Sequence, residues 1–116
     1  IDGHVFGVPM QADVTGLWYR RDWFEQEGLT PPTTWDDLRA LLAHFDRSEV
    51  KAKLGHEHPI LFPTTNAAGE ATVNVLFPLI WGAGGELLDD EGNLALMDEN
   101  VYRALDFLEE ITCKAD

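Results

Sequence analysis

The run GLTPPTTWDDL at residues 28–38 constrains the fold of this chain strongly, because it interrupts one helix and starts another. The two consecutive prolines lack backbone N–H donors and hold the chain extended, so no helix passes through them. Thr34 is placed as an N-cap, and Asp37 stands three residues later as its capping-box partner. The run therefore predicts a joint between a helix that ends at Gly28 and a helix that begins at Trp35, with the indole packed into the joint.

Apolar spacing predicts further helices around this joint. Asp22 and Glu25 have the spacing of a capping box that opens a short helix before Gly28. A further helical turn is expected before Gly55, and a mostly buried helix at 75–82, where a proline starts or kinks the chain. A last helix is expected after an Asp98 cap. The helical faces are formed by Trp35, Leu38, Leu41, Leu42 and Phe45, by Val50 and Leu54, and by Val101, Leu105, Leu108 and Ile111.

Runs of β-branched and aromatic residues predict strands between these helices. Such runs occupy residues 4–9, 15–20 and 59–63, and the segment 86–96 is typical of a hairpin with an acidic glycine turn. The order of elements predicts an α/β fold with a mixed sheet and flanking helices, in a single domain over residues 1–116.

The charge balance excludes several kinds of partner. The chain has 8 Lys and Arg and 21 Asp and Glu, which gives a net charge of −13. This charge argues against binding nucleic acid or an anionic membrane surface. The chain has no apolar run long enough to span a bilayer. Cys113 is the only cysteine, so no intrachain disulfide is expected, and packing suits it better than nucleophilic chemistry. The opening IDGHVFGVP is typical of the interior of a longer protein.

The motifs that carry chemistry are weak, and they predict neither a catalytic residue nor a cofactor. His56 and His58 could both bind a metal, but a third ligand at workable spacing is not evident, so a polar loop is favoured. The stretch DDEGN lacks the alternating acids of a calcium loop. Tryptophan faces can stack on sugar rings; core packing is favoured for Trp23 and Trp35, whereas Trp18 and Trp81 suit either role equally.

Three stretches together resemble one protein family. DGHVFGVP, GLWYRRDWFEQEGLTPPTTWDDL and LIWGAGGELLDDEGNLAL are similar, in this order, to segments of the extracellular solute-binding proteins of ABC importers, specifically the sugar-binding type related to maltose-binding protein. The resemblance covers nearly all of the chain. It identifies the run at 28–38 as a structural signature of the family, and so makes Trp35 architectural.

The resemblance implies one part of a two-lobed periplasmic-binding-protein type II fold, in which a sugar lies in the cleft between lobes. This chain would be the first segment of the C-terminal lobe, without the N-terminal lobe and the rest of its own lobe. It would act outside the cytoplasm, in the periplasm or as a cell-surface lipoprotein, would deliver its ligand to a membrane permease, and would not be an enzyme. The sugar-binding positions that it implies are Gln11, Asp13, Glu70, Thr72 and Asn74, with Trp81 on the cleft wall. Where maltose-binding proteins carry an acid and an aromatic residue, this chain has Thr72 and Asn74, which favours another sugar.

Three alternatives remain open. The ligand could be a non-sugar solute such as a polyamine or a metal, because the family includes such members. A carbohydrate-active enzyme would need two acids at catalytic separation, and an acidic protein-binding domain would need no small ligand. Uncovered strand edges and helix faces also predict that this chain alone is marginally stable or forms a homodimer.

Overall fold

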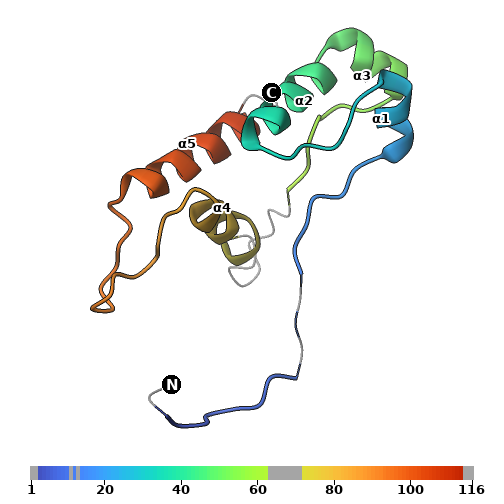
Figure 1. The fold of residues 1–116 in the computed structure, drawn as a ribbon. Helices are drawn as coiled ribbons and strands as arrows, with labels where there is room; N and C mark the ends of the chain where they lie inside the picture. Colours follow the sequence, from blue (N-terminus) through green and yellow to red (C-terminus); the bar gives the residue numbers. More distant parts are fainter. Residues whose placement is uncertain (1–2, 11, 13, 63–71, 114–116) are drawn as a thin grey trace.

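A computed structural model describes residues 3–10, 12, 14–62 and 72–113, and this part of the chain consists of helices joined by loops (Figure 1). None of its helices has both the length and the apolar character needed to cross a bilayer. The helices are α1 (Arg21–Glu27), α2 (Trp35–Phe45), α3 (Ser48–Leu54), the π-helical turn η1 (Thr72–Leu76), α4 (Phe77–Gly82) and α5 (Glu99–Cys113).

The predicted mixed sheet is wrong. No strand forms in the described residues, and their only β feature is an isolated antiparallel bridge between Leu88 and Leu94. The described parts of the predicted strands 4–9, 15–20 and 59–63 lie outside any ladder. A helix satisfies its backbone hydrogen bonds within one segment, whereas a strand needs a second strand beside it, so strand-forming composition alone does not produce a sheet.

The predicted hairpin at 86–96 is present only as a tight turn. The Asp89 carboxylate accepts hydrogen bonds from the backbone N–H of Glu91 at 3.0 Å and of Asn93 at 2.7 Å. The backbone N–H of Ala95 donates to the carbonyl of Leu87 at 3.0 Å. The bonds from Asn93 and Glu91 lower the pKa of Asp89. The turn is therefore organised by one carboxylate rather than by two paired strands.

The predicted joint between helices is confirmed. Gly28 ends α1 in the left-handed conformation, with φ of 67°. Thr34 caps α2, accepting from the Asp37 backbone N–H at 3.1 Å, and the Asp37 carboxylate accepts from the Thr34 backbone N–H at 2.9 Å. The reciprocal bonds satisfy two of the donors that a helix start leaves unpaired.

The capping box predicted for α1 is wrong. The N-cap residue is Arg20, and no side chain caps the helix. Instead, the Arg20 guanidinium donates to the Asp22 carboxylate at 2.9 Å, and this bond lowers the pKa of Asp22. The helix begins earlier than predicted, so Asp22 lies inside the first turn, where its charge suits the helix dipole, rather than at the N-cap position.

The core consists of two apolar clusters. One joins α1, α2 and α3, and its buried residues are Phe24, Leu41, Phe45 and Val50. The other joins α4 to α5, and its buried residues are Ile80, Val101 and Ala104, with Trp35 among those packed against it.

Trp35 links α2 to α5. Its ring stacks on the buried ring of Phe107, with centroids 4.3 Å apart and planes at 11°. Arg39 lies over the same Phe107 ring at 4.7 Å and binds Glu110 at 2.7 Å. The indole is packed, but its partner is α5, the last helix in sequence, rather than the joint between α1 and α2 that the sequence predicted.

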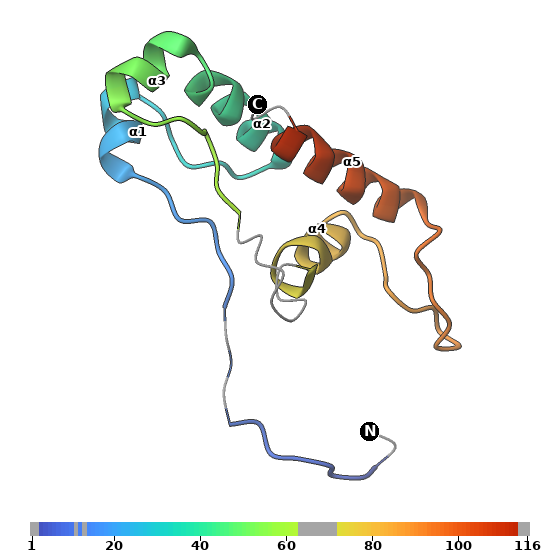
Figure 2. The ribbon, with the colours of Figure 1, turned by 180° about the vertical axis from the view of Figure 1, so that it is seen from behind.

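The N-terminal part of the chain extends away from these helices. We call residues 3–10, 12 and 14–18 the arm; Figures 1 and 2 show it leaving α1 and running clear of the helical body in two opposite views. The radius of gyration is 17.7 Å, against roughly 13 Å for a compact domain of about 100 residues. The arm is therefore extended and unpacked, and the body is helical.

Candidate functional site

The predicted ligand positions divide into two groups. Gln11, Asp13 and Glu70 lie outside the described residues. The other three, Thr72, Asn74 and Trp81, lie on one helical segment formed by η1 and α4. The structure therefore brings half of the predicted positions onto a single element.

This segment folds as a helix with two unlike faces. Pro78 occupies the first turn of α4, where a missing N–H costs no hydrogen bond, so it starts the helix. Ile80 is 2% exposed and packs with Val101 and Ala104 of α5. Thr72, Asn74 and Trp81 remain exposed. The apolar contact with α5 thus fixes the segment and leaves its polar and aromatic side chains accessible.

An aromatic pair lies within this segment. Trp81 is 52% exposed, and its ring meets that of Phe77 edge to face, with centroids 5.8 Å apart. Phe77 was not among the predicted positions, although its spacing of four residues from Trp81 places both on one side of a helix. We call Asn74, Phe77 and Trp81, which recur at helical spacing, the η1–α4 surface; Thr72 is exposed on the same segment but lies only two residues before Asn74, on another side of the helix.

The chemistry of the η1–α4 surface suits a neutral polar ligand. The sequence has no charged residue and no histidine from 71 to 85. The Asn74 amide both donates and accepts hydrogen bonds. An exposed indole offers a flat apolar face for the C–H side of a ring. This surface can therefore combine stacking with hydrogen bonds to hydroxyl groups.

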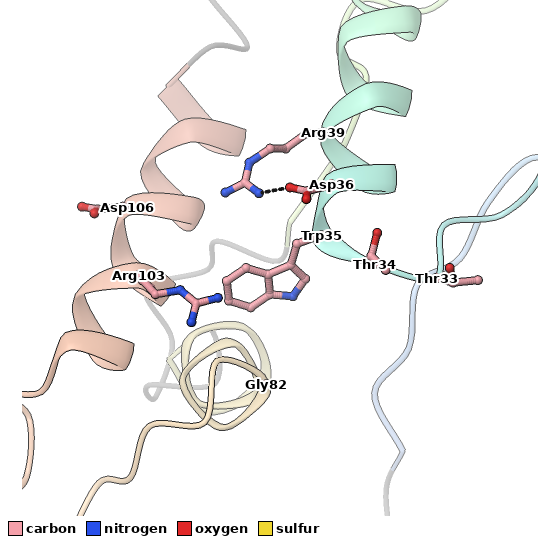
Figure 3. Close-up of a pocket in the computed structure, with 8 residues that line it drawn as sticks. All are labelled: Thr33, Thr34, Trp35, Asp36, Arg39, Gly82, Arg103 and Asp106. Carbon is pink, nitrogen blue, oxygen red and sulfur yellow. Dashed lines mark hydrogen bonds and ion pairs between the residues drawn. The ribbon is translucent and has the colours of Figure 1, made fainter.

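A concave region lies where α2, α4 and α5 meet (Figure 3). It is an open hollow of about 620 Å³, with the Trp35 ring between the helices. Its lining residues are Thr33, Thr34, Trp35, Asp36, Arg39, Gly82, Arg103 and Asp106.

Several of these lining groups already hold the helices together. The Asp36 carboxylate accepts from Arg39 at 2.8 Å, and the Glu110 carboxylate accepts from the same guanidinium at 2.7 Å. The bond to Glu110, followed by that to Asp36, raises the pKa of Arg39. Because Trp35 also stacks on Phe107, this hollow is a structural junction.

His56, considered above as a metal ligand, serves in packing. Its ring stacks on Trp23 with centroids 5.0 Å apart, and it meets the edge of Phe45 at 6.0 Å. Across residues 3–10, 12, 14–62 and 72–113, no three His, Cys, Asp or Glu side chains form a group able to hold a metal ion. Trp23 likewise packs against the first apolar cluster, as expected.

The family model for bacterial extracellular solute-binding proteins matches residues 1–113. A lactose-binding protein from Rhizobium radiobacter is 32% identical over 109 residues, which are 90% of this chain and 23% of the relative. An uncharacterized ABC transporter extracellular-binding protein from Pyrococcus horikoshii is 42% identical over 62 residues, 53% of this chain and 14% of that protein.

A multiple sugar-binding protein from Streptococcus mutans is 36% identical over 53 residues, 46% of this chain and 11% of the relative. The chain thus spans at most about a quarter of the length of these relatives. No solved structure matches it.

Proposed function

The chain belongs to the bacterial extracellular solute-binding proteins, a family of ABC-transporter components that act outside the cytoplasm and are not enzymes, and on this premise we propose that it binds a sugar. The η1–α4 surface supplies part of the binding site. The rest of the site lies on the opposite wall of an interlobe cleft, and the bound sugar passes to a membrane permease.

The observation that carries this proposal is the pairing of an exposed aromatic surface with uncharged hydrogen-bonding groups. Trp81 and Phe77 offer ring faces and edges, and Asn74 lies three residues before Phe77 on the same helical segment. A sugar ring presents C–H groups on its face and hydroxyls at its rim, which matches this combination.

A polyamine is the main alternative ligand, and the charge of the surface disfavours it. A polycation needs carboxylates close to each ammonium group. The sequence carries no acid from 71 to 85, so the η1–α4 surface itself supplies no carboxylate; the two acids among the predicted positions, Asp13 and Glu70, lie outside the described residues. Two relatives, a lactose-binding protein and a multiple sugar-binding protein, also favour a sugar.

The proposal is tested by titrating the 116-residue chain with lactose, maltose and spermidine while recording the tryptophan indole N–H signals by NMR. We expect a sugar to shift the Trp81 signal saturably, at millimolar concentration because only one wall of the cleft is present. In Trp81→Ala, the Kd for the sugar, followed through the shifts of neighbouring backbone signals, should rise by roughly tenfold. This corresponds to the loss of a stacking contact of about 1.4 kcal/mol. Tyr102→Ala, which removes an exposed aromatic ring from α5, is the matched control and should leave them unchanged.

Shifts with spermidine alone would replace the sugar by a cationic solute. Sugar shifts that persist unchanged in Trp81→Ala would move the site away from the η1–α4 surface. A sugar-hydrolysis assay with Asp13→Asn and Glu70→Gln addresses the enzyme alternative, because turnover lost in either variant would contradict a binding role.

A further inference from the structure

The segment that carries Trp81 is short. Together, η1 and α4 span residues 72–82, and an isolated helix of fewer than about 12 residues is marginal in water. A side chain that stacks on a ligand has to be held within about 0.5 Å of its productive position by the groups around it. The direction in which the Trp81 ring faces a ligand therefore depends on what packs against this segment, above all at its C-terminal end, where Trp81 lies.

The indole of Trp35 lies against the last residue of α4. A Cβ atom on Gly82 would be 3.8 Å from Cζ2 of Trp35, an ordinary van der Waals distance, and Figure 3 shows the Trp35 ring beside this end of α4. Gly82 follows Trp81 directly, and the peptide unit that joins them is planar and rigid. A displacement of Gly82 therefore turns the backbone of Trp81 and, with it, the direction of the ring.

Trp35 is itself held from the side of α5. Its ring stacks on that of Phe107 with centroids 4.3 Å apart, and Phe107 is 1% exposed. The Arg39 guanidinium covers the same phenylalanine ring at 4.7 Å and donates to the Glu110 carboxylate at 2.7 Å. The indole is thus fixed at the level of its ring, so it can act as a brace between α5 and the end of α4.

Other contacts near Trp81 do not take the place of this brace. The Gly84 N–H donates to the Trp81 carbonyl at 3.0 Å, and the Gly85 N–H donates to the Ile80 carbonyl at 2.9 Å. These bonds close the end of α4, but they move with it as one unit. Ile80 connects α4 to α5 on the buried face. Trp35 connects the same helix to α2 beside Trp81, and so restricts rotation of α4 about its contact with α5.

We propose that Trp35 is a positioning residue for the ligand contact at Trp81. Its indole braces Gly82 and thereby sets the direction of the Trp81 ring, without touching the ligand itself. The proposal rests on the sugar-binding function proposed above. It also gives the run at 28–38 a part in binding, because the prolines and the Thr34 cap place Trp35 at the start of α2.

The test compares two variants of the 116-residue chain that each shorten an aromatic side chain of α2. Trp35→Phe keeps a ring that can stack on Phe107 but removes Cζ2, the atom beside Gly82. We expect the nuclear Overhauser contacts between the rings of Trp81 and Phe77 to change in the ligand-free protein. The Kd for lactose should rise by roughly threefold or more.

The matched control is Phe45→Leu, which alters the first apolar cluster. It should lower the urea midpoint of unfolding, as Trp35→Phe does, yet leave the ring contacts and the Kd unchanged. The double variant Trp35→Phe/Gly82→Ala should recover most of the lost affinity, because the added methyl group points at the space that Cζ2 leaves.

Two results would overturn the proposal. One is a Trp35→Phe variant with wild-type ring contacts and a wild-type Kd. The other is a Kd that rises equally in Phe45→Leu, since binding would then follow overall stability. A wild-type chain that binds neither lactose nor maltose would count against the proposed function instead, and the contacts between Phe77 and Trp81 in the ligand-free protein would still show whether Trp35 positions the ring.

Discussion

Helix α2 and the arm are both rich in apolar residues, yet one is packed and the other is exposed. In α2, Leu41 and Phe45 are buried against neighbouring helices, whereas Val5 and Trp18 in the arm are almost fully exposed. The difference lies in how each backbone is satisfied. A helix closes its own hydrogen bonds and then needs a partner for one face only, while a strand needs a partner for its backbone as well.

The largest expected contrast is between two phenylalanines. Phe107→Ala should lower the free energy of unfolding by about 3–5 kcal/mol, because it leaves a cavity and removes the ring on which Trp35 stacks. Phe6→Ala in the arm should change it by less than about 0.5 kcal/mol in dilute protein. Urea unfolding followed by circular dichroism measures both values, and equal effects would show that the arm is part of the cooperative core.

Two glycines give the next contrast. A Cβ on Gly85 would lie 3.1 Å from Cγ2 of Ile80 and 3.3 Å from Cγ2 of Val101, whereas a Cβ on Gly16 would meet no atom within 4 Å. Gly85→Ala should therefore destabilise the chain by about 1–3 kcal/mol through overpacking between α4 and α5. Gly16→Ala should have little effect. Thermal unfolding of the two variants compares them, and a neutral Gly85→Ala would mean that this contact relaxes freely.

The helix joint gives a smaller effect. Thr34→Ala removes the oxygen that accepts from the Asp37 backbone N–H, and it should cost about 1 kcal/mol of stability. Thr30→Ala, an exposed threonine ahead of the prolines, is the matched control and should be close to neutral. If both variants unfold at the same urea concentration, the capping box does not contribute measurably.

The smallest expected effect is a dependence of stability on pH. Hydrogen bonds from Thr33, through its backbone and then its hydroxyl, and from Thr34 lower the pKa of Asp37 from 3.8 to about 2. Because the folded value is lower than the unfolded one, Asp37 stabilises the fold above pH 3.8, and this contribution is lost as the pH falls through about 2. Asp37→Asn should flatten the acid limb of a plot of unfolding midpoint against pH.

Part of that limb should remain in the Asp37 variant. Lys53 and, to a smaller extent, His44 lower the pKa of Glu27 through hydrogen bonds at 2.6 Å and 2.9 Å, so Glu27 also contributes stability that acid removes. Asp90→Asn changes the net charge equally at a position far from the cap and serves as the control. An acid limb that is identical in all three proteins would exclude a role for the Asp37 cap.

Local sequence determined where several helices begin and end. The prolines before Trp35, the Thr34–Asp37 box and the left-handed Gly28 and Gly55 all lie where the sequence predicted them. Each depends on bonds or torsions within a few residues of one another. The failed box at Asp22 also has a local cause, because the helix begins at Arg21 and places Asp22 inside the first turn rather than at its cap.

The candidate site was predictable only in part, because it also depends on contacts between residues that are not close neighbours in sequence. Composition left Trp81 equally suited to core packing and to stacking on a sugar. The resemblance to the family pointed to Thr72 and Asn74, which the structure places on the same segment as Trp81. Phe77 was missed, because its role depends on the edge-to-face contact with Trp81 and on which face of α4 packs against α5. A sequence without a known packing partner does not say which face of a buried helix remains exposed.

By itself, therefore, the sequence determined several helix boundaries, the net negative charge and the break between α1 and α2, since these depend on short-range bonds and on composition. Only the tertiary structure decided that Trp35 stacks on Phe107, seventy-two residues later, and that the apolar side chains of the arm stay exposed while the helices pack. Contacts between distant residues and the pairing of strands depend on which surfaces meet. That information belongs to the assembled chain rather than to any one of its segments.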